Sequence, residues 1–393
     1  MKKSMRKILA AVLALTLIVG LFAACGSKED SGTQTGAETI KIGAIGPLTG
    51  GAAVYGNAVK NGAQLAVDEI NKAGGINGMK IEFRMEDDEH DAEKSVNAYN
   101  TLKDWGMQML MGTVTTQPCL AVINNTKADN MYQLTPSASG ADVIVNDNTF
   151  QVCFTDPNQG IASADYIADN RIAKKVAVIY NSSDAYSSGI YNTFKSEAAA
   201  KGLEIVATEA FTEDSKTDFS AQLTKVKSSG AELLFLPIYA DAASSLLSQA
   251  SKLGLNVKYF GCDGLDGILD IEGFDGKLAE NVMLLTPFAA NATDETTQKF
   301  VSAFKAAGYE ESTLNQFAAD AYDAIYIMKA AAEKSGVKAG MSVSEIGDAM
   351  KGVMPQITVD GVTGSGMKWL STGEVSKTPK AVKIVNGEYQ AME

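Results

Sequence analysis

The sequence predicts an α/β protein with two doubly wound parallel-sheet lobes. From residue 39 onward, apolar runs rich in β-branched residues alternate with helical patterns. This switching between periods of 2 and 3.6 is typical of βαβ units. The pattern restarts near residue 157, which indicates a second lobe. The chain length of 393 residues also suits two domains better than one.

The first predicted lobe alternates strand and helix. Its strands are expected at 40–45, 79–85, 107–111 and 131–135, and its helices at 56–72, 92–105 and 117–128. The second predicted lobe has helices at 157–170, 187–201, 219–228 and 240–253, and strands at 175–180, 204–210, 232–237, 258–261 and 281–286. Helices at 295–307, 316–335 and 343–350 follow, and then a hairpin of 357–369 with 379–385. Since this tail extends neither sheet simply, we expect the chain to cross back between lobes.

The N-terminus predicts export. Four basic residues precede an uncharged apolar run over 8–24, which is the layout of a secretory signal, although a transmembrane anchor is the alternative. Ala23, Ala24, Cys25 and the polar stretch that follows resemble a bacterial lipoprotein signal with Cys25 as the lipidated residue. Phe22 departs from that pattern, in which leucine is usual. We therefore expect a signal peptide over 1–24 and a lipid-anchored tether over 25–39, with the folded part exported.

Charge and cysteine content exclude several classes of protein. Removal of residues 1–24, which carry four positive charges and no negative ones, changes the net charge from −13 to −17. Such an acidic surface argues against nucleic acid binding and against an electrostatic membrane patch. The three remaining cysteines, Cys119, Cys153 and Cys262, allow at most one disulfide. Both a Cys119–Cys153 bridge and buried free thiols remain open.

No catalytic, metal or cofactor site is predicted. The only histidine, His90, lies in the acidic run 86–91, and no Gly-x-Ser-x-Gly elbow precedes it. One histidine also excludes a His-based zinc site. Asp87, Glu89 and Asp91 have calcium-loop spacing, but Ala92 occupies the position that requires glycine. We interpret this run as a solvated strand end and helix start.

The stretch 112–139 predicts half of a small-molecule site. Two short apolar strands each end in a cluster of hydroxyl residues, and the first cluster runs directly into a helix. Ligands of open α/β sheets bind at the carboxyl ends of strands, where helix N-termini favour anions. Thr116 and Ser139 offer hydroxyl donors, and Ser137 offers a backbone N–H. This half is therefore expected to bind a carboxylate.

Arginine is scarce in this chain. Arg6 belongs to the predicted signal, Arg84 lies mid-strand, and Arg171 precedes a strand of the second lobe. No bidentate arginine clamp is therefore evident. Recognition of an anion by neutral dipoles suits a zwitterion better than a dicarboxylate.

Eight segments of the mature chain resemble one family. They are 40–50, 55–56, 62–71, 74–78, 86–88, 135–139, 154–160 and 261–264. In this order they are similar to the branched-chain amino acid binding proteins, which are type I periplasmic-type binding proteins of ABC transporters. The resemblance implies two lobes joined by a three-segment hinge, with the ligand in the cleft between them. Lobe one would comprise 40–155 and 288–345, and lobe two 156–287 and 346–393.

The resemblance also implies the ligand-contacting positions. They are Tyr55, Thr115 or Thr116, Ser137, Ala138, Ser139, Tyr186, Tyr239 and Asp263. Asp263 would meet the α-ammonium group, at a position where relatives often carry glutamate, with Asp266 as its alternative.

The function implied is that of a solute-binding protein and not of an enzyme. The protein would be a monomer, lipid-anchored on the outer face of the cytoplasmic membrane or periplasmic. It would capture an aliphatic amino acid and deliver it to an ABC transporter permease and ATPase complex. The alternatives are a ligand sensor of the same fold, or a binding protein for another small carboxylate or amide.

Overall fold

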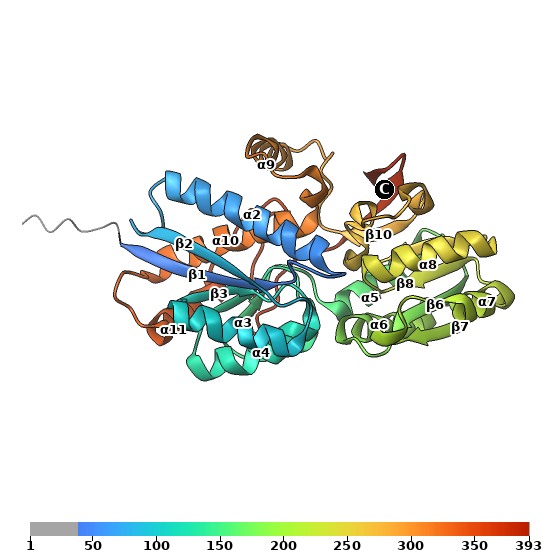
Figure 1. Ribbon diagram of the computed structural model, residues 1–393, viewed down its shortest axis with the longest axis horizontal. Helices are drawn as coiled ribbons and strands as arrows, with labels where there is room; N and C mark the ends of the chain where they lie inside the picture. The colour runs from blue at the N-terminus through green and yellow to red at the C-terminus, as the bar shows by residue number, and fades with distance from the viewer. Residues whose placement is uncertain (1–37, 393) are drawn as a thin grey trace, which may run out of the picture. The chain divides into compact units, whose positions relative to one another are not determined.

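Two separate sheets organise residues 38–392, the part of the chain that the computed structural model describes (Figure 1). The predicted signal, the Cys25 lipidation site and nearly all of the tether lie outside the described residues. The strands are β1 (Thr39–Gly46), β2 (Lys80–Asp87), β3 (Met109–Gly112), β4 (Gln133–Thr135), β5 (Thr149–Gln151), β6 (Lys175–Asn181), β7 (Glu204–Phe211), β8 (Leu233–Leu236), β9 (Lys258–Gly261), β10 (Met283–Thr286), β11 (Lys380–Val385) and β12 (Glu388–Ala391).

The helices fill most of the sequence between these strands. They are α2 (Ala53–Lys72), α3 (Ala92–Trp105), α4 (Thr116–Asp129), α5 (Asp156–Asp169), α6 (Ala185–Ala200), α7 (Ser220–Ser229), α8 (Ala240–Leu253), α9 (Glu295–Ala306), α10 (Gln316–Ser335) and α11 (Val343–Val353). Short 3₁₀ turns complete the loops, among them η3 (Asp263–Leu265) and η4 (Ile268–Asp270).

Sheet one, with the helices packed on it, forms the first lobe. Its strand order is β2-β1-β3-β4-β5, and all neighbours are parallel. Ile40 and Ile42 of β1 belong to the core cluster that includes α2 and α10, whereas Ile45 packs with α3. Successive strand residues point to opposite faces, so both faces of this sheet are covered, as Figure 1 shows. That burial explains the near-continuous apolar run of β1.

Sheet two, with its helices, forms the second lobe. Its order is β12-β11-β10-β9-β8-β6-β7, in which β11 is antiparallel to β10 and to β12, and the other neighbours are parallel. Val176 and Val178 of β6 pack with α5 and α6, whereas Ala177 and Ile179 join the cluster that includes α7 and α8. The predicted doubly wound arrangement is confirmed in both lobes.

The chain passes between the lobes three times. The first connection follows β5, and the second follows β10, after which α10 packs on α2 and α11 contacts β3. The third connection enters β11. Before it does so, the Trp369 indole donates a hydrogen bond of 2.7 Å to the Gln151 carbonyl, so residues up to this point run along the first lobe.

The predicted hairpin of 357–369 with 379–385 is wrong. Residues 357–369 form only isolated bridges, such as Val359 with Met367. β11 instead pairs with β10 on one side and with β12 on the other. The turn before β12 has Asn386 and Gly387 at positive φ, which is the backbone that a tight hairpin requires.

Close packing of α2 on α10 depends on one glycine. A Cβ atom on Gly62 would lie 1.9 Å from the carbonyl oxygen of Ala318. We expect Gly62→Ala to lower the free energy of unfolding by about 1–3 kcal/mol, because overpacking forces the helices apart. The matched control is Gly352→Ala in α11, where an added Cβ meets nothing within 4 Å and the helix should gain stability. Urea unfolding of both variants checks the prediction, and equal stability would contradict it.

Candidate functional site

Two loops of the first lobe meet at the carboxyl end of sheet one. Met111 of β3 pairs with Leu134 of β4, so the loops after these strands start side by side. The Thr116 hydroxyl, at the start of α4, accepts hydrogen bonds from the N–H groups of Ser139 and Gly140 at 3.3 and 3.4 Å. The structure therefore brings Thr116 and Ser139 together in one hydroxyl cluster.

Ser137 and Ala138 hold their loop in shape. The Ser137 hydroxyl donates to the Val114 carbonyl at 2.6 Å, and the Ala138 N–H donates to the Thr135 hydroxyl at 2.8 Å. Both residues are buried. The Ser137 hydroxyl is thus occupied by a contact between the two loops.

Thr115 and Thr116 have different surroundings. Thr115 is the N-cap residue of α4, but its side chain does not cap the helix. Its hydroxyl lies 2.9 Å from Nδ1 of His90 instead. An uncapped helix N-terminus retains unpaired N–H groups, which favour an anion. Of the two threonines, Thr116 is the one that contacts the Ser139 loop.

The second lobe contributes Tyr186 and Asp263. Leu236 of β8 pairs with Gly261 of β9, which brings the residues after these strands to one edge. The Tyr186 hydroxyl donates to Asp263 Oδ1 at 2.8 Å and accepts from the Gly264 N–H at 2.9 Å. Burial raises the pKa of Asp263 to about 6, although the Tyr186 hydrogen bond opposes the shift. The Asp263 carboxyl is therefore held in a fixed position, and burial makes its ionised form unfavourable in free energy.

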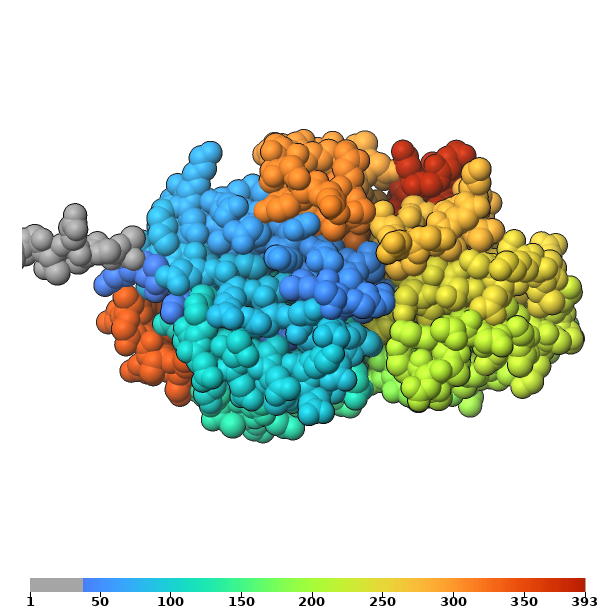
Figure 2. All heavy atoms as spheres, viewed as in Figure 1, coloured from blue at the N-terminus to red at the C-terminus, as the bar shows by residue number. Residues whose placement is uncertain are grey.

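Tyr239 and Tyr55 complete an aromatic group at this edge. The rings of Tyr239 and Tyr186 stack at 4.6 Å between centroids, and Tyr55 lies 5.5 Å from Tyr239. The Tyr55 hydroxyl, from α2 of the first lobe, donates to the Gly264 carbonyl at 2.7 Å and accepts from the Ala240 N–H at 2.8 Å. Tyr55 therefore bridges the two lobes, and in Figure 2 the blue start of α2 lies against the yellow part of the second lobe.

Asp156 is a candidate site residue that the sequence did not predict. It lies in the first turn of α5 and is 1% exposed, and neither carboxylate oxygen has a hydrogen-bond partner among the described residues. Burial raises the pKa of Asp156 well above the usual range. The neighbouring Ser139 side chain lowers this pKa, whereas the negative charge of Asp263 raises it further. A Cβ on Gly140 would lie 3.6 Å from Oδ2. The carboxylate thus adjoins the hydroxyl cluster.

The sequence held a weak signal for Asp156. It belongs to the segment 154–160 that resembles the binding-protein family, but an aspartate in the first turn of a helix is ordinarily explained by the helix dipole. Asp184 instead has the ordinary role of an N-cap residue, since its Oδ2 accepts from the Ser187 N–H at 2.9 Å at the start of α6. Only the three-dimensional arrangement separates the two aspartates.

Part of the acidic run 86–91 is buried. Asp91 caps α3 as a helix-start residue, but Asp88 is fully buried, and burial raises its pKa to about 7. The prediction of a solvated run is therefore wrong for Asp88. His90 contacts Thr115 and Tyr239.

The structure also shows the surroundings of Asp266 and of the three cysteines. Asp266 accepts from the Gln316 N–H at 3.1 Å, so it faces the start of α10. Cys119, Cys153 and Cys262 are buried free thiols, so there is no Cys119–Cys153 disulfide among the described residues.

Neither described arginine belongs to the site. Arg84 pairs with Glu86 at 2.6 Å, and Arg171 lines a separate pocket of about 660 Å³ with Lys174 and Lys258. The candidate site therefore carries the carboxylates of Asp156 and Asp263, hydroxyl groups and aromatic rings, without a guanidinium.

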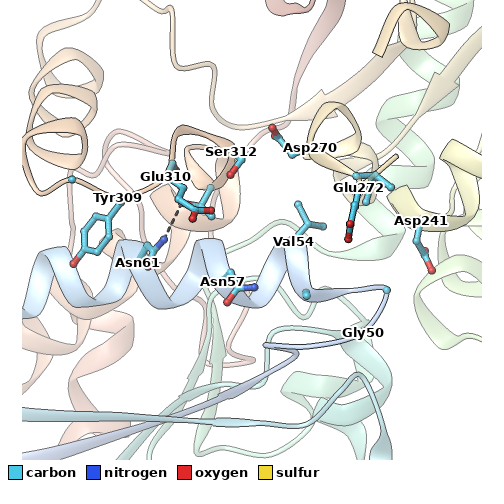
Figure 3. Close-up of a pocket in the computed structure, with 15 residues that line it drawn as sticks. Gly50, Val54, Asn57, Asn61, Asp241, Asp270, Glu272, Tyr309, Glu310 and Ser312 are labelled. Carbon is cyan, nitrogen blue, oxygen red and sulfur yellow. Dashed lines mark hydrogen bonds between the residues drawn. The ribbon is translucent and has the colours of Figure 1, made fainter. Parts of the chain in front are cut away.

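A polar pocket of about 910 Å³ lies beside this cluster (Figure 3). The first lobe contributes Asn57 and Asn61 of α2, and the second contributes Asp241, Asp270 and Glu272. No predicted site residue lines it. Its carboxylates make it a poor place for the carboxylate of a ligand.

Comparison with known proteins gives a concordant result. The family described as "Periplasmic binding protein" matches residues 39–388. The chain is 33% identical over 299 residues to "Leu/Ile/Val-binding protein homolog 3" of Brucella melitensis, covering 76% of this chain and 79% of that relative. It is 29% identical over 321 residues to the "Leucine-, isoleucine-, valine-, threonine-, and alanine-binding protein" of Pseudomonas aeruginosa, covering 80% and 84%.

Solved structures share the fold. The branched-chain amino acid transporter substrate binding protein LivJ of Streptococcus pneumoniae, in complex with isoleucine, has a TM-score of 0.80 at 28% identity, covering 90% of this chain and 98% of that chain. A solute binding protein from R. palustris in complex with benzoate also has a TM-score of 0.80, but at 19% identity, so it shows a shared fold alone. In the described part of this chain, no helix is long and apolar enough to cross a membrane.

Proposed function

Because the chain belongs to the branched-chain amino acid binding family of ABC transporter solute-binding proteins, we propose that it captures leucine, isoleucine or valine between its lobes and delivers the amino acid to a membrane permease. The relatives named for these three amino acids support the choice of ligand. The ligand contacts and the lipid anchor described below are part of the same proposal.

The observation that carries the proposal is the buried, unpaired carboxylate of Asp156 next to the hydroxyl cluster. An α-amino acid presents a carboxylate and an ammonium within one small group. The Thr116 and Ser139 hydroxyls and the N-terminus of α4 suit the carboxylate. Asp156 and Asp263 suit the ammonium, whose three N–H donors need acceptors. A simple benzoate has no cation to offer these aspartates.

The remaining predicted residues receive supporting roles. Ser137, Ala138 and Thr115 shape the carboxylate half, and Tyr186 and Tyr239 form an aromatic wall beside the ammonium. Tyr55 holds the lobes together through the Gly264 carbonyl and the Ala240 N–H. A ligand that touches both lobes stabilises the closed arrangement by its differential affinity.

The family places the folded part outside the cytoplasm. We propose that Cys25, after cleavage of residues 1–24, carries a lipid that holds the monomer at the outer face of the cytoplasmic membrane. The polar residues before Thr39 would then act as a tether between the lipid and the folded part. This arrangement keeps the binding protein near its permease and ATPase partners.

A thermal-shift screen of all amino acids tests the proposed ligand. Leucine, isoleucine or valine should raise the melting temperature, because a ligand at about one hundred times its dissociation constant adds about 2.7 kcal/mol of stability. Benzoate and 4-hydroxybenzoate serve as negative controls. Stabilisation only by aromatic acids, amides or sugars would contradict the ligand assignment. Unimpaired uptake after deletion of the gene would favour a sensor over a transport protein.

A further inference from the structure

His90 is the only histidine in the 393-residue chain, and it lies between the two lobes. Its Nδ1 is 2.9 Å from the Thr115 hydroxyl of the first lobe. Its ring stands edge-on to Tyr239 of the second lobe, at 5.2 Å between centroids and 81° between planes. One imidazole therefore contacts a predicted ligand residue from each lobe.

The backbone around His90 directs its side chain to this place. Glu89 and His90 both have positive φ, of 49° and 61°, a conformation that is uncommon outside glycine. The Asp88 carboxylate stabilises the turn by accepting the His90 N–H at 2.9 Å. Thr115, in turn, leaves α4 uncapped and contacts the imidazole. The positive φ angles of the His90 turn and the uncapped start of α4 thus both accompany the contact between His90 and Thr115.

We propose that His90 is a positioning residue of the ligand site, which holds Thr115 in the first lobe and Tyr239 in the second when the lobes are closed. The inference rests on the proposed function, because these two side chains are assigned to the amino acid site. His90 would not touch the ligand. It would fix the loop that leads to Thr116, and it would orient the tyrosine wall opposite.

Charges around the imidazole determine how this role depends on pH. They are Asp91 on its own loop and Glu213, Lys216 and Asp241 of the second lobe. Asp88, on the same loop, is a further titratable group, whose carboxylate accepts the backbone N–H of His90. Burial lowers the pKa of His90, while Glu213 and Asp241 oppose the shift. The neutral ring therefore suits the closed arrangement. As pH falls through the ordinary histidine pKa, protonation favours the open arrangement, in which water surrounds the ring.

The first experiment uses the imidazole as its own probe. In an untagged protein, His90 gives a single set of imidazole signals in a proton–carbon NMR spectrum, so its pKa can be measured without assignment. We expect the pKa to be lower with saturating L-isoleucine than without it, because closure removes water from the ring. The same pKa in both conditions would overturn the inference.

Two variants separate the contacts of His90. Asparagine tolerates positive φ, and its amide can hold Thr115 in place of Nδ1, whereas His90→Ala loses both contacts. We expect His90→Ala to weaken L-isoleucine binding at pH 7.5 by about tenfold, and His90→Asn to recover part of that loss. Melting temperatures without ligand verify that both variants fold. Equal affinity of His90→Ala and wild type would also overturn the inference.

The pH profile provides a readout that a purely structural role would not move. Between pH 7.5 and pH 5.5, the affinity of wild type for L-isoleucine should fall about threefold more than that of His90→Asn, since the buried aspartates titrate in both proteins and His90 in only one. If the affinities of wild type and His90→Asn fell in parallel, the proposed role of His90 would be wrong, while the proposed function would stand. If wild type bound none of leucine, isoleucine and valine, the proposed function itself would fail and this inference with it.

Discussion

Replacement of Asp156 with asparagine is expected to abolish most amino acid binding while making the protein without ligand more stable. The buried carboxylate has no hydrogen-bond partner among the described residues, so its ionised form destabilises the folded chain. The amide removes this charge. The substitution also removes the proposed partner of the ligand ammonium, at a cost of about 2–5 kcal/mol in binding. Calorimetric titration with isoleucine and urea unfolding measure the two opposite effects.

The gain in stability should depend on pH in a defined direction. Since the pKa of Asp156 is raised in the folded chain, the folded state holds this proton more tightly than the unfolded state does. Its destabilising effect is therefore absent below the unfolded pKa of about 3.9 and grows as pH rises above that value. The stability difference between Asp156→Asn and wild type should increase over the same range.

A matched control distinguishes ligand contact from relief of a buried charge. Asp88 is also buried with one unpaired carboxylate oxygen, and Asp88→Asn keeps the oxygen that accepts the His90 N–H. This variant should gain stability but retain its affinity within about threefold, which corresponds to less than 1 kcal/mol. Normal isoleucine affinity in Asp156→Asn would remove Asp156 from the site.

Lys377→Met is expected to produce the largest loss of stability. Lys377 is buried, and its ammonium donates to Asp320 at 2.5 Å, to Thr363 at 2.6 Å and to the Val152 carbonyl at 3.1 Å. Removal of one partner of a buried ion pair leaves the other charge uncompensated, at a cost of about 3–5 kcal/mol. Urea unfolding should show this loss.

Two further variants test whether the loss of stability comes from the buried charge. Lys377→Met combined with Asp320→Asn should recover part of the stability, because the second change removes the orphaned charge. Lys299→Met, which breaks an exposed pair with Glu295, should change stability by less than about 0.5 kcal/mol. A loss in Lys377→Met no larger than that in Lys299→Met would contradict the prediction.

Local patterns predicted the fold well where elements are long and periodic. The switch from strand to helical period placed β1, α2, β6 and α6 within a few residues, because their apolar faces must be buried. β5 was missed, since Thr149–Gln151 is three residues long and alternates too briefly. The predicted partner strand of β11 was wrong because the actual partner, β12, is mostly exposed and contains few apolar residues.

The resemblance named most residues of the candidate site, and the ends of parallel strands explain why several of them lie together. Tyr186, Tyr239 and Asp263 converge because each follows a parallel strand of one sheet. Asp156 was not predicted because its burial arises from other segments of the chain, including the loop at Gly140 and helix α6 at Gly189. The place of His90 similarly depends on Tyr239, which is 149 residues later in the chain. Such contacts leave no trace in local periodicity.

The two hydrogen bonds of the Tyr55 hydroxyl have a consequence for how ligand affinity can be tuned. They join the lobes through backbone groups, the Gly264 carbonyl and the Ala240 N–H, so they contribute equally whichever amino acid lies between. A change that weakens this link shifts the closed population and raises every apparent dissociation constant by a common factor. A substitution at this link would therefore change the affinity for every ligand while preserving the order of preference among them.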